Sequence, residues 1–131
     1  MCLTKKHSQK KVEIGIITFY AAQVAILKQH ITKSKVGFNN SCFRIKVMSV
    51  DGFQGSESDI IILSFVRSNK KSAVGFLKDF QRLNVALTRA KHNLVMFGDA
   101  DTLENSDCKD LQRLILDMKN RSALIDKKYF V

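Results

Sequence analysis

The sequence predicts an α/β fold in which helices cover both faces of a parallel sheet, so that the domain has three layers. Two observations lead to this prediction. Short apolar runs rich in Val and Ile recur along the chain and are bounded by polar or glycine-containing segments. Longer segments between them show the i, i+3, i+4, i+7 spacing of amphipathic helices. Strands that alternate with helices favour parallel pairing, because a parallel crossover needs a connection of this length.

Four apolar segments are predicted to be strands, because they are too short for buried helices and are rich in β-branched residues. Residues 59–65 (DIIILSF) are the most apolar of them and are expected at the centre of the sheet. The other three are residues 12–18, 44–50 and 93–97. Residues 123–125 are a candidate for a short additional strand at the edge of the sheet.

Three longer segments, residues 20–33, 77–91 and 107–121, are predicted to be helices. Each carries an apolar stripe that we expect to face the core. The stripes are formed by Ala21, Val24, Leu27 and Ile31, by Phe80, Leu83 and Leu87 with Ala86 and Ala90, and by Leu111, Leu114, Ile115 and Met118. The predicted connections are a loop at 35–41, a turn at 51–58 with one short helical turn, and a lysine-rich loop at 67–75.

The composition is that of a globular protein. The chain has 131 residues and 45% hydrophobic content, which suits one domain with one core. No apolar run approaches the ~20 residues of a membrane-spanning helix. The basic start MCLTKKHSQKK has no apolar segment behind it, so no secretory signal is predicted. The three cysteines are far apart and form no CxxC pair, so we expect no metal site and an intracellular protein, cytoplasmic or nuclear.

The net charge of +10 indicates a polyanionic partner. Residues 1–11 form a basic extension that we expect to be disordered or artificially added, yet the charge without its four lysines is still +6. The chain has no basic amphipathic helix with large exposed aromatic residues, so nucleic acid is favoured over a membrane surface. The folded domain is expected at residues 12–126, followed by a tail at 127–131.

Two segments combine polar residues in an unusual way. They are residues 49–69 (SVDGFQGSESDIIILSFVRSN) and the predicted helix at 77–91 (LKDFQRLNVALTRAK), which holds Asn84, Thr88 and Arg89. A helix that only packs against a core does not need these polar groups. An arginine near the end of a packed helix can direct its planar guanidinium at a phosphate.

The two segments resemble motifs V and VI of superfamily 1 nucleic-acid helicases. The similarity is to the Upf-type branch, which includes the nonsense-mediated-decay helicase, senataxin and the immunoglobulin mu-binding helicase. Residues 14–23 (IGIITFYAAQ) are similar to motif IV of that branch. The resemblance covers residues 11–99, in family order and with family-like spacing, and motif VI is its most specific part. It implies the second, C-terminal RecA-like domain of a two-domain motor.

The parts of the family that hold ATP do not occur in this sequence. There is no phosphate-binding loop GxxxxGK[ST], and no acidic pair follows an apolar strand in the manner of a Walker B site. The resemblance therefore implies that ATP with Mg²⁺ is bound mainly by the N-terminal RecA-like domain of the same protein. The family also has further segments before motif IV, so the domain is expected to be incomplete. We expect this chain alone to be monomeric and inactive.

At the nucleotide, the resemblance makes Arg89 the arginine finger that reaches the γ-phosphate. Glu57 matches the motif V acid near the ribose and phosphates, and its alternative role is to cap the start of a helix. Gly55 matches a position that needs positive φ or close approach of a ligand. Gln54 is a candidate polar link between the nucleotide and nucleic-acid sites.

Some relatives place a second phosphate-binding arginine directly after the motif IV glutamine, where this sequence has Val24. Arg67 and Arg82 are the candidates to replace it. Arg82 is therefore included among the nucleotide-binding residues, and its alternative is an ion pair with Asp79 or Asp51.

The resemblance places the nucleic-acid backbone near five residues, Thr18, Tyr20, Gln23, Ser49 and Asp51. Hydroxyl groups and backbone N–H groups suit phosphate contacts that carry no sequence information, and an aromatic ring can pack near a base. For Ser49 the alternative is a residue that only forms a turn. Ligands of parallel sheets bind at the carboxyl ends of the strands, so we expect these residues and Arg89 to lie at the same edge.

The implied function is that of a C-terminal motor domain in an ATP-dependent helicase, which moves along single-stranded RNA or DNA and acts in nonsense-mediated decay. One alternative is a DNA-directed nuclease-helicase, whose motifs V and VI are similar. Another is a RecA-like adaptor that binds nucleic acid or protein without motor activity. An adaptor does not need an arginine finger, so Arg89 and Glu57 favour the motor.

Overall fold

The structure, a computed structural model, describes residues 10–67 and 74–130. At its centre is a four-stranded sheet in which all strands are parallel, in the order β2-β1-β3-β4. The strands are β1 (Val12–Thr18), β2 (Phe43–Ser49), β3 (Ser58–Ser64) and β4 (Ala90–Phe97). This architecture confirms the predicted α/β class and is consistent with part of a RecA-like fold. The apolar strand β3 lies in the interior of the sheet, as predicted.

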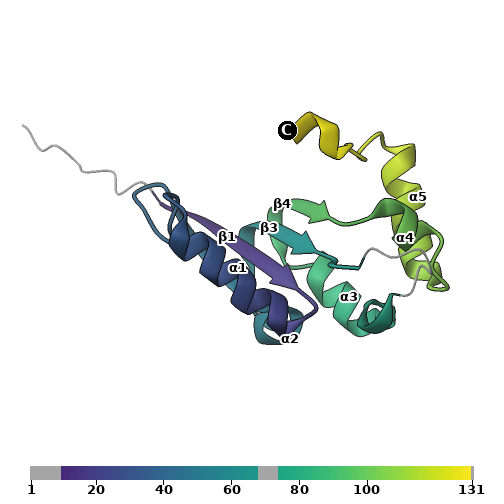
Figure 1. Cartoon of the computed structure of the whole chain (residues 1–131), viewed down its shortest axis with the longest axis horizontal. Helices are drawn as coiled ribbons and strands as arrows, with labels where there is room; N and C mark the ends of the chain where they lie inside the picture. Colours follow the sequence, from purple (N-terminus) through teal and green to yellow (C-terminus); the bar gives the residue numbers. More distant parts are fainter. Residues whose placement is uncertain (1–9, 68–73, 131) are drawn as a thin grey trace, which may run out of the picture.

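Helices lie on both faces of this sheet. α1 (Ala21–Lys33) connects β1 to β2 and covers one face. α2 (Val50–Phe53) and α3 (Phe80–Leu87) belong to connections that cross the sheet in the opposite direction, and right-handed crossovers therefore put them on the other face. α4 (Ala100–Glu104) and α5 (Lys109–Asn120) follow β4 and lie at the opposite end of the molecule from α1 (Figure 1).

The main core lies between the sheet and the helices on the α2–α3 face. Alternate residues of β1 and β3, among them Ile17, Ile61 and Leu63, are fully buried and pack in one cluster with Phe53 of α2. Gly15 allows this close packing. A Cβ atom at residue 15 would lie 2.8 Å from Cζ of Phe53 and 2.7 Å from Cδ1 of Ile61.

The predicted helix at residues 77–91 is too long. A 3₁₀ helix, η1 (Gly75–Lys78), comes first, and α3 then begins after Asp79. The Asp79 carboxylate accepts a hydrogen bond of 3.2 Å from the backbone N–H of Arg82, which is the geometry of an N-cap and separates the two helices. The chain leaves the helix after Leu87 and enters β4 at Ala90.

The apolar stripe of this segment is confirmed only in part. Leu83 and Ala86 are buried as predicted, but Phe80 is 60% exposed, and its predicted place in the core is wrong. Phe80 is the first residue of α3, and its side chain lies outside the buried stripe. In α5 the predicted Leu111 and Ile115 are buried.

Other boundaries differ from the predictions in smaller ways. The candidate edge strand at 123–125 is wrong: this segment has no regular structure and is followed by a second 3₁₀ helix, η2 (Lys127–Phe130). Helix α4 was not predicted, because five residues are too few for a periodic pattern. The lysine-rich loop predicted at 67–75 lies outside the described residues from 68 to 73. No helix in the described ranges has the length and apolar character needed to cross a membrane.

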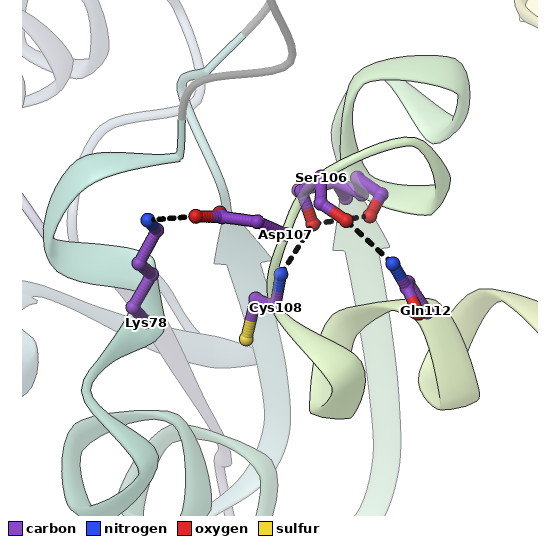
Figure 2. A network of polar contacts seen from close by, with 6 residues as sticks. Lys78, Ser106, Asp107, Cys108 and Gln112 are labelled. Carbon is purple, nitrogen blue, oxygen red and sulfur yellow. Dashed lines mark hydrogen bonds and ion pairs between the residues drawn. The ribbon is translucent and has the colours of Figure 1, made fainter.

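The connection between α4 and α5 contacts the segment that precedes α3 (Figure 2). Lys78 of η1 donates to the Asp107 carboxylate at 2.5 Å, and this hydrogen bond lowers the pKa of Asp107. Within the same connection, Nε2 of Gln112 donates to the carbonyl oxygen of Ser106 at 2.5 Å. Cys108 is buried beside this network as part of the core.

Strands β1 and β3 are also tied together near their amino ends. The Asp59 carboxylate accepts a hydrogen bond of 2.9 Å from the backbone N–H of Glu13. This bond lowers the pKa of Asp59, and the positive charges of Lys91 and Lys10 lower it further. The contact fixes the register of the two central strands at this end.

Candidate functional site

The predicted site residues lie at two opposite ends of the parallel sheet. The carboxyl ends of β1, β2 and β3 are Thr18, Ser49 and Ser64, which are neighbours in the strand register. Arg89 lies at the amino end, because it directly precedes β4 and its carbonyl oxygen accepts a hydrogen bond of 3.2 Å from the backbone N–H of Ser58. The prediction that Arg89 shares the carboxyl edge is therefore wrong. α3 runs back along the sheet and delivers Arg89 to the far side, about 20 Å away for a strand of this length.

At the carboxyl end, two residues predicted from motif IV are joined in one hydrogen-bond network. The hydroxyl of Thr18 donates to Oε1 of Gln23, and Nε2 of Gln23 donates to Oγ of Ser64 at 2.9 Å. Thr18 is fully buried, so its direct effect is to fix the orientation of the Gln23 amide. Ser64 was missed by the sequence analysis. The recurrence of a hydroxyl residue at the end of three neighbouring strands is the signal that could have found it.

Tyr20 and Arg67 form a second contact at the carboxyl end. Nε of Arg67 donates to the Tyr20 hydroxyl at 2.7 Å, and the guanidinium carbon lies 5.1 Å from the centre of the Tyr20 ring. Arg67 follows β3, so it belongs to the end of the sheet opposite Arg89. That Arg67 replaces the second arginine of motif IV stays a prediction. Val24, the position of that arginine in some relatives, lies in the first turn of α1, also near the carboxyl end.

Ser49 and Asp51 lie at the start of α2. Ser49 is the N-cap of this helix, and its hydroxyl accepts a hydrogen bond of 3.3 Å from the backbone N–H of Gly52. Asp51 forms an ion pair with Arg82 of α3, with 3.0 Å between Oδ2 and Nη2, and Asp79 lies 3.7 Å from Nε of the same guanidinium. The ion-pair alternative for Arg82 is thus present in the structure. This ion pair joins Asp51, which is predicted to contact nucleic acid, to Arg82, which is predicted to bind the nucleotide.

A groove of about 150 Å³ separates α2 from α3 beside this ion pair. Its polar lining residues are Asp51, Gln54, Asp79, Gln81 and Arg82. Sites for drug-sized ligands usually measure ~300–1,000 Å³. The groove is therefore too small to hold a nucleotide by itself, and a nucleotide bound near this face needs a second wall.

The amino end holds Gly55, Glu57 and Arg89. Gly55 has a φ of +78°, and this positive φ was predicted. No atom lies within 4 Å of the place where a Cβ atom would be, so glycine is favoured here by the backbone conformation and not by lack of space. Glu57 is exposed and immediately precedes β3, so the alternative that it caps a helix is wrong. Gln54 is the exposed C-cap of α2, between the two ends.

Arg89 is half-buried in the short link between α3 and β4. Its Nη2 donates to the hydroxyl of Thr88 at 3.1 Å, while its Nε is buried without a hydrogen-bond partner. No carboxylate of the described residues lies within ion-pair distance of it. The guanidinium is therefore held in place and still has donors for an anion.

Comparison with known proteins places these segments in one family. Residues 1–101 match the family described as "AAA domain". The chain is 45% identical over 115 residues to "Regulator of nonsense transcripts 1" of Dictyostelium discoideum, an alignment that covers 87% of this chain and 8% of that protein. It is 41% identical over 130 residues to "DNA replication ATP-dependent helicase/nuclease DNA2" of Xenopus tropicalis, covering 95% of this chain and 12% of that protein.

A third relative is "Helicase sen1" of Schizosaccharomyces pombe, which is 46% identical over 95 residues, or 72% of this chain and 6% of that protein. The chain thus spans roughly a tenth of the length of the curated relatives that it matches.

Proposed function

Because the chain belongs to the AAA domain family and to the superfamily 1 helicases, we propose that it is the C-terminal RecA-like motor domain of an ATP-dependent helicase. In this proposal the carboxyl end of the sheet contacts single-stranded RNA or DNA. The amino end completes an ATP site whose main part lies on the N-terminal RecA-like domain of the same protein. The helicase is of the Upf type and acts in the cytoplasm or the nucleus.

The observation that carries the proposal is the state of Arg89. Its Nε is buried without a partner, and a buried polar group of this kind calls for an explanation such as an absent ligand. Its planar fork of donors matches the oxygens of a phosphate better than a lysine would. Arg89 follows a packed helix, so a phosphate brought to it would meet a charge that is already oriented.

Mg-ATP, when bound by the partner domain, would supply the γ-phosphoryl group that is transferred to water. The part of Arg89 would be to stabilise the charge on the phosphoryl oxygens as the bond breaks. Glu57 would face the ribose and phosphate edge, with Gly55 giving the backbone its turn beside it. Gln54, at the end of α2, would sense both the nucleotide and the Ser49–Asp51 segment.

The carboxyl end would hold the nucleic-acid backbone. Ser49, Gln23 and Tyr20 present hydroxyl and amide groups that suit phosphates and sugars, and Tyr20 also has a ring that can pack near a base. These groups carry no base-specific pattern, so binding without sequence preference is expected. The net charge of +10 favours the same class of ligand.

The experiment that tests the proposal uses a longer protein that includes the N-terminal RecA-like domain. Arg89→Gln is compared with Arg113→Gln, which removes the same charge from an exposed position on α5. We expect Arg89→Gln to lower kcat for ATP hydrolysis at least about a hundredfold and to weaken nucleotide binding much less, since the charge acts mainly on the transition state. Arg89→Lys should restore little, because an ammonium lacks the planar fork.

The control variant, Arg113→Gln, should hydrolyse ATP at nearly the wild-type rate. If Arg89→Gln also did so while Glu57→Gln lost activity, the finger assignment would fail and Arg82 would be the next residue to test.

A second candidate is a DNA-directed nuclease-helicase, favoured by the 95% coverage of this chain in its alignment with the helicase/nuclease relative. The motor mechanism proposed for this domain would be the same. Comparing ATP hydrolysis stimulated by single-stranded RNA with that stimulated by single-stranded DNA separates the two: stimulation by DNA alone would favour the nuclease-helicase.

A further inference from the structure

Arg67 resembles Arg89 in one respect that sets both apart from the other partly buried arginine. Arg82 is also partly buried, but it pairs with carboxylates. Arg67 and Arg89 are half-buried and have no carboxylate within ion-pair distance in the ranges 10–67 and 74–130. Residues 1–9 and 68–73 contain no Asp or Glu that could serve.

A partly buried charge without a counter-ion is unfavourable unless other groups compensate for lost water. For Arg67 the compensation is incomplete. The Tyr20 hydroxyl accepts one hydrogen bond, from Nε, at 2.7 Å, and the ring of Tyr20 lies beside the guanidinium. This arrangement leaves the two Nη groups, with four N–H donors, without a hydrogen-bond acceptor among the described residues.

The guanidinium also lies close to the backbone of Gly75. Gly75 has a φ of +53°, and a Cβ atom there would lie 2.7 Å from Nη2 of Arg67 and 3.1 Å from the Tyr20 hydroxyl. Glycine at this position therefore lets the backbone pack directly onto the arginine. The partly buried Arg67 therefore packs against both the Tyr20 side chain and the backbone of Gly75.

The backbone before Arg67 is strained in a way that fixes its direction. Val66 has a φ of +66°, a conformation that β-branched residues rarely adopt, and the N–H of Arg67 donates to the carbonyl oxygen of Phe65 at 2.7 Å. These features define a γ-turn of the rare, strained kind. Such strain persists where surrounding structure imposes it, and it is concentrated at functional sites.

We propose that Arg67 is a phosphate-binding residue for single-stranded nucleic acid at the carboxyl end of the sheet, and that Tyr20 orients it. The proposal rests on the proposed function and deepens it, because it adds a charged contact to a set that otherwise consists of neutral groups and Asp51. Arg67 follows β3 by three residues, and its partner Tyr20 directly precedes α1, which carries Gln23, so Arg67 lies at the same end of the sheet as the Thr18–Gln23–Ser64 network. The ligand is a backbone phosphodiester, since the nucleotide is assigned to the opposite end.

The test measures binding of a fluorescent single-stranded homopolymer by the 131-residue chain over a range of salt concentrations. Arg67→Gln should weaken binding about tenfold at low salt, as expected for a lost charge-assisted contact. The slope of log affinity against log salt should become less steep by about 0.7, the value for one phosphate contact to a single strand. Arg113→Gln removes the same charge from exposed α5 and should leave the slope unchanged.

Two further variants separate binding from a merely structural role. Arg67→Lys keeps the charge, so it should retain the slope while lowering affinity. Tyr20→Phe removes the hydroxyl that holds Nε, so it should weaken binding a few-fold in the wild type and clearly less in the Arg67→Gln background. Additive effects of Tyr20→Phe and Arg67→Gln would overturn the orienting role of Tyr20.

Failure of this inference can be told apart from failure of the proposed function. If the wild-type chain binds the homopolymer and Arg67→Gln binds with the same affinity and slope, Arg67 is not a phosphate contact, although the carboxyl end still binds nucleic acid. If the wild-type chain does not bind nucleic acid at any salt concentration, both proposals are wrong. Competition by inorganic phosphate equal to that by the homopolymer would show a general anion site and would also overturn the inference.

Discussion

The two ends of the sheet differ in how many contacts between their predicted site residues the domain itself supplies. At the carboxyl end, Thr18, Gln23 and Ser64 are joined to one another, and Tyr20 holds Arg67. At the amino end, Glu57 is exposed and Arg89 keeps a buried nitrogen without a partner. Contacts within the domain orient the predicted site residues at the carboxyl end. At the amino end, the buried nitrogen of Arg89 lacks such a contact, so this end resembles one half of a site that a second domain would complete. This difference is what one expects if nucleic acid binds to this domain directly and a nucleotide binds only where a second domain meets it.

Two helices, α2 and α3, connect the two ends of the sheet. α2 starts at the carboxyl end beside Ser49 and leads toward Glu57, while α3 starts near Asp79 and leads to Arg89. The two helices are linked by the pair between Arg82 and Asp51. Substitutions that affect one end, both ends or the link between them can therefore test whether the two ends differ in this way.

The largest expected effect concerns the chain on its own. We expect the 131-residue chain to bind single-stranded nucleic acid and to show no ATP hydrolysis above background, because it has no phosphate-binding loop. Steady-state hydrolysis with and without a single-stranded homopolymer measures this. Activity that disappears in Arg89→Ala would contradict the view that the amino end is only half a site, whereas activity unaffected by Arg89→Ala would indicate a contaminating enzyme.

The next largest effect is on the stability of the core that supports both ends of the sheet. Phe53→Ala should lower the free energy of unfolding by about 3–5 kcal/mol, because it removes a fully buried ring at the centre of the core. Phe80→Ala provides the control, since the exposed Phe80 should contribute well under about 1 kcal/mol. Urea denaturation followed by circular dichroism measures both. Equal destabilisation by the two variants would mean that α2 does not anchor the two ends to the sheet.

A smaller effect is expected from the link between the ends. The Arg82–Asp51 pair is partly exposed, so Asp51→Asn should cost less than about 1 kcal/mol of stability. In the longer protein we expect this variant to reduce the stimulation of ATP hydrolysis by nucleic acid about fivefold while basal hydrolysis changes little. Arg121→Gln, which breaks an exposed ion pair with Asp117 on α5, is the matched control. A proportional loss of basal and stimulated activity would rule out a linking role.

How much of this could be predicted from the sequence depends on the range of the interactions involved. Strands β1 to β4 and the buried stripe of α5 follow from local apolar patterns, because burial of those patterns decides the structure. Glu57 and Arg89 were predicted as site residues from motifs V and VI, that is, from residue types alone, and these roles stay predictions. The positive φ of Gly55 was predicted for the same reason, since few other residues accept that conformation.

The position of Arg89 could not be predicted in the same way. It depends on α3 ending at Leu87, and the apolar spacing continues through Ala90 without a break, so the pattern suggested a longer helix. The Tyr20–Arg67 contact joins residues 47 positions apart and depends on a strained turn at Val66 that no pattern indicates. Ser64 acquires its role only because β1 and β3 are neighbours, which is a property of the strand order.

The smallest expected effect is the pH dependence of the contact that fixes the amino end. The folded-state pKa of Asp59 is lowered, so its carboxylate contributes stability that is present above the unfolded pKa of about 3.9 and is lost as pH falls through the folded pKa. We expect Asp59→Asn to flatten the acid side of a plot of unfolding midpoint against pH. An unchanged acid limb in this variant would show that the bond to Glu13 does not control that limb.

The packing of Phe53 against Gly15 has a consequence for which substitutions this domain can accept. Any side chain at residue 15, even a methyl group, would overlap the ring of Phe53 and the side chain of Ile61. The overlapped atoms belong to two fully buried side chains, so relief requires Phe53 or Ile61 to shift within the core. Phe53 belongs to α2, which leads from Ser49 at one end of the sheet toward Glu57 at the other. We therefore expect Gly15→Ala to disturb α2 although residue 15 itself belongs to neither predicted binding end.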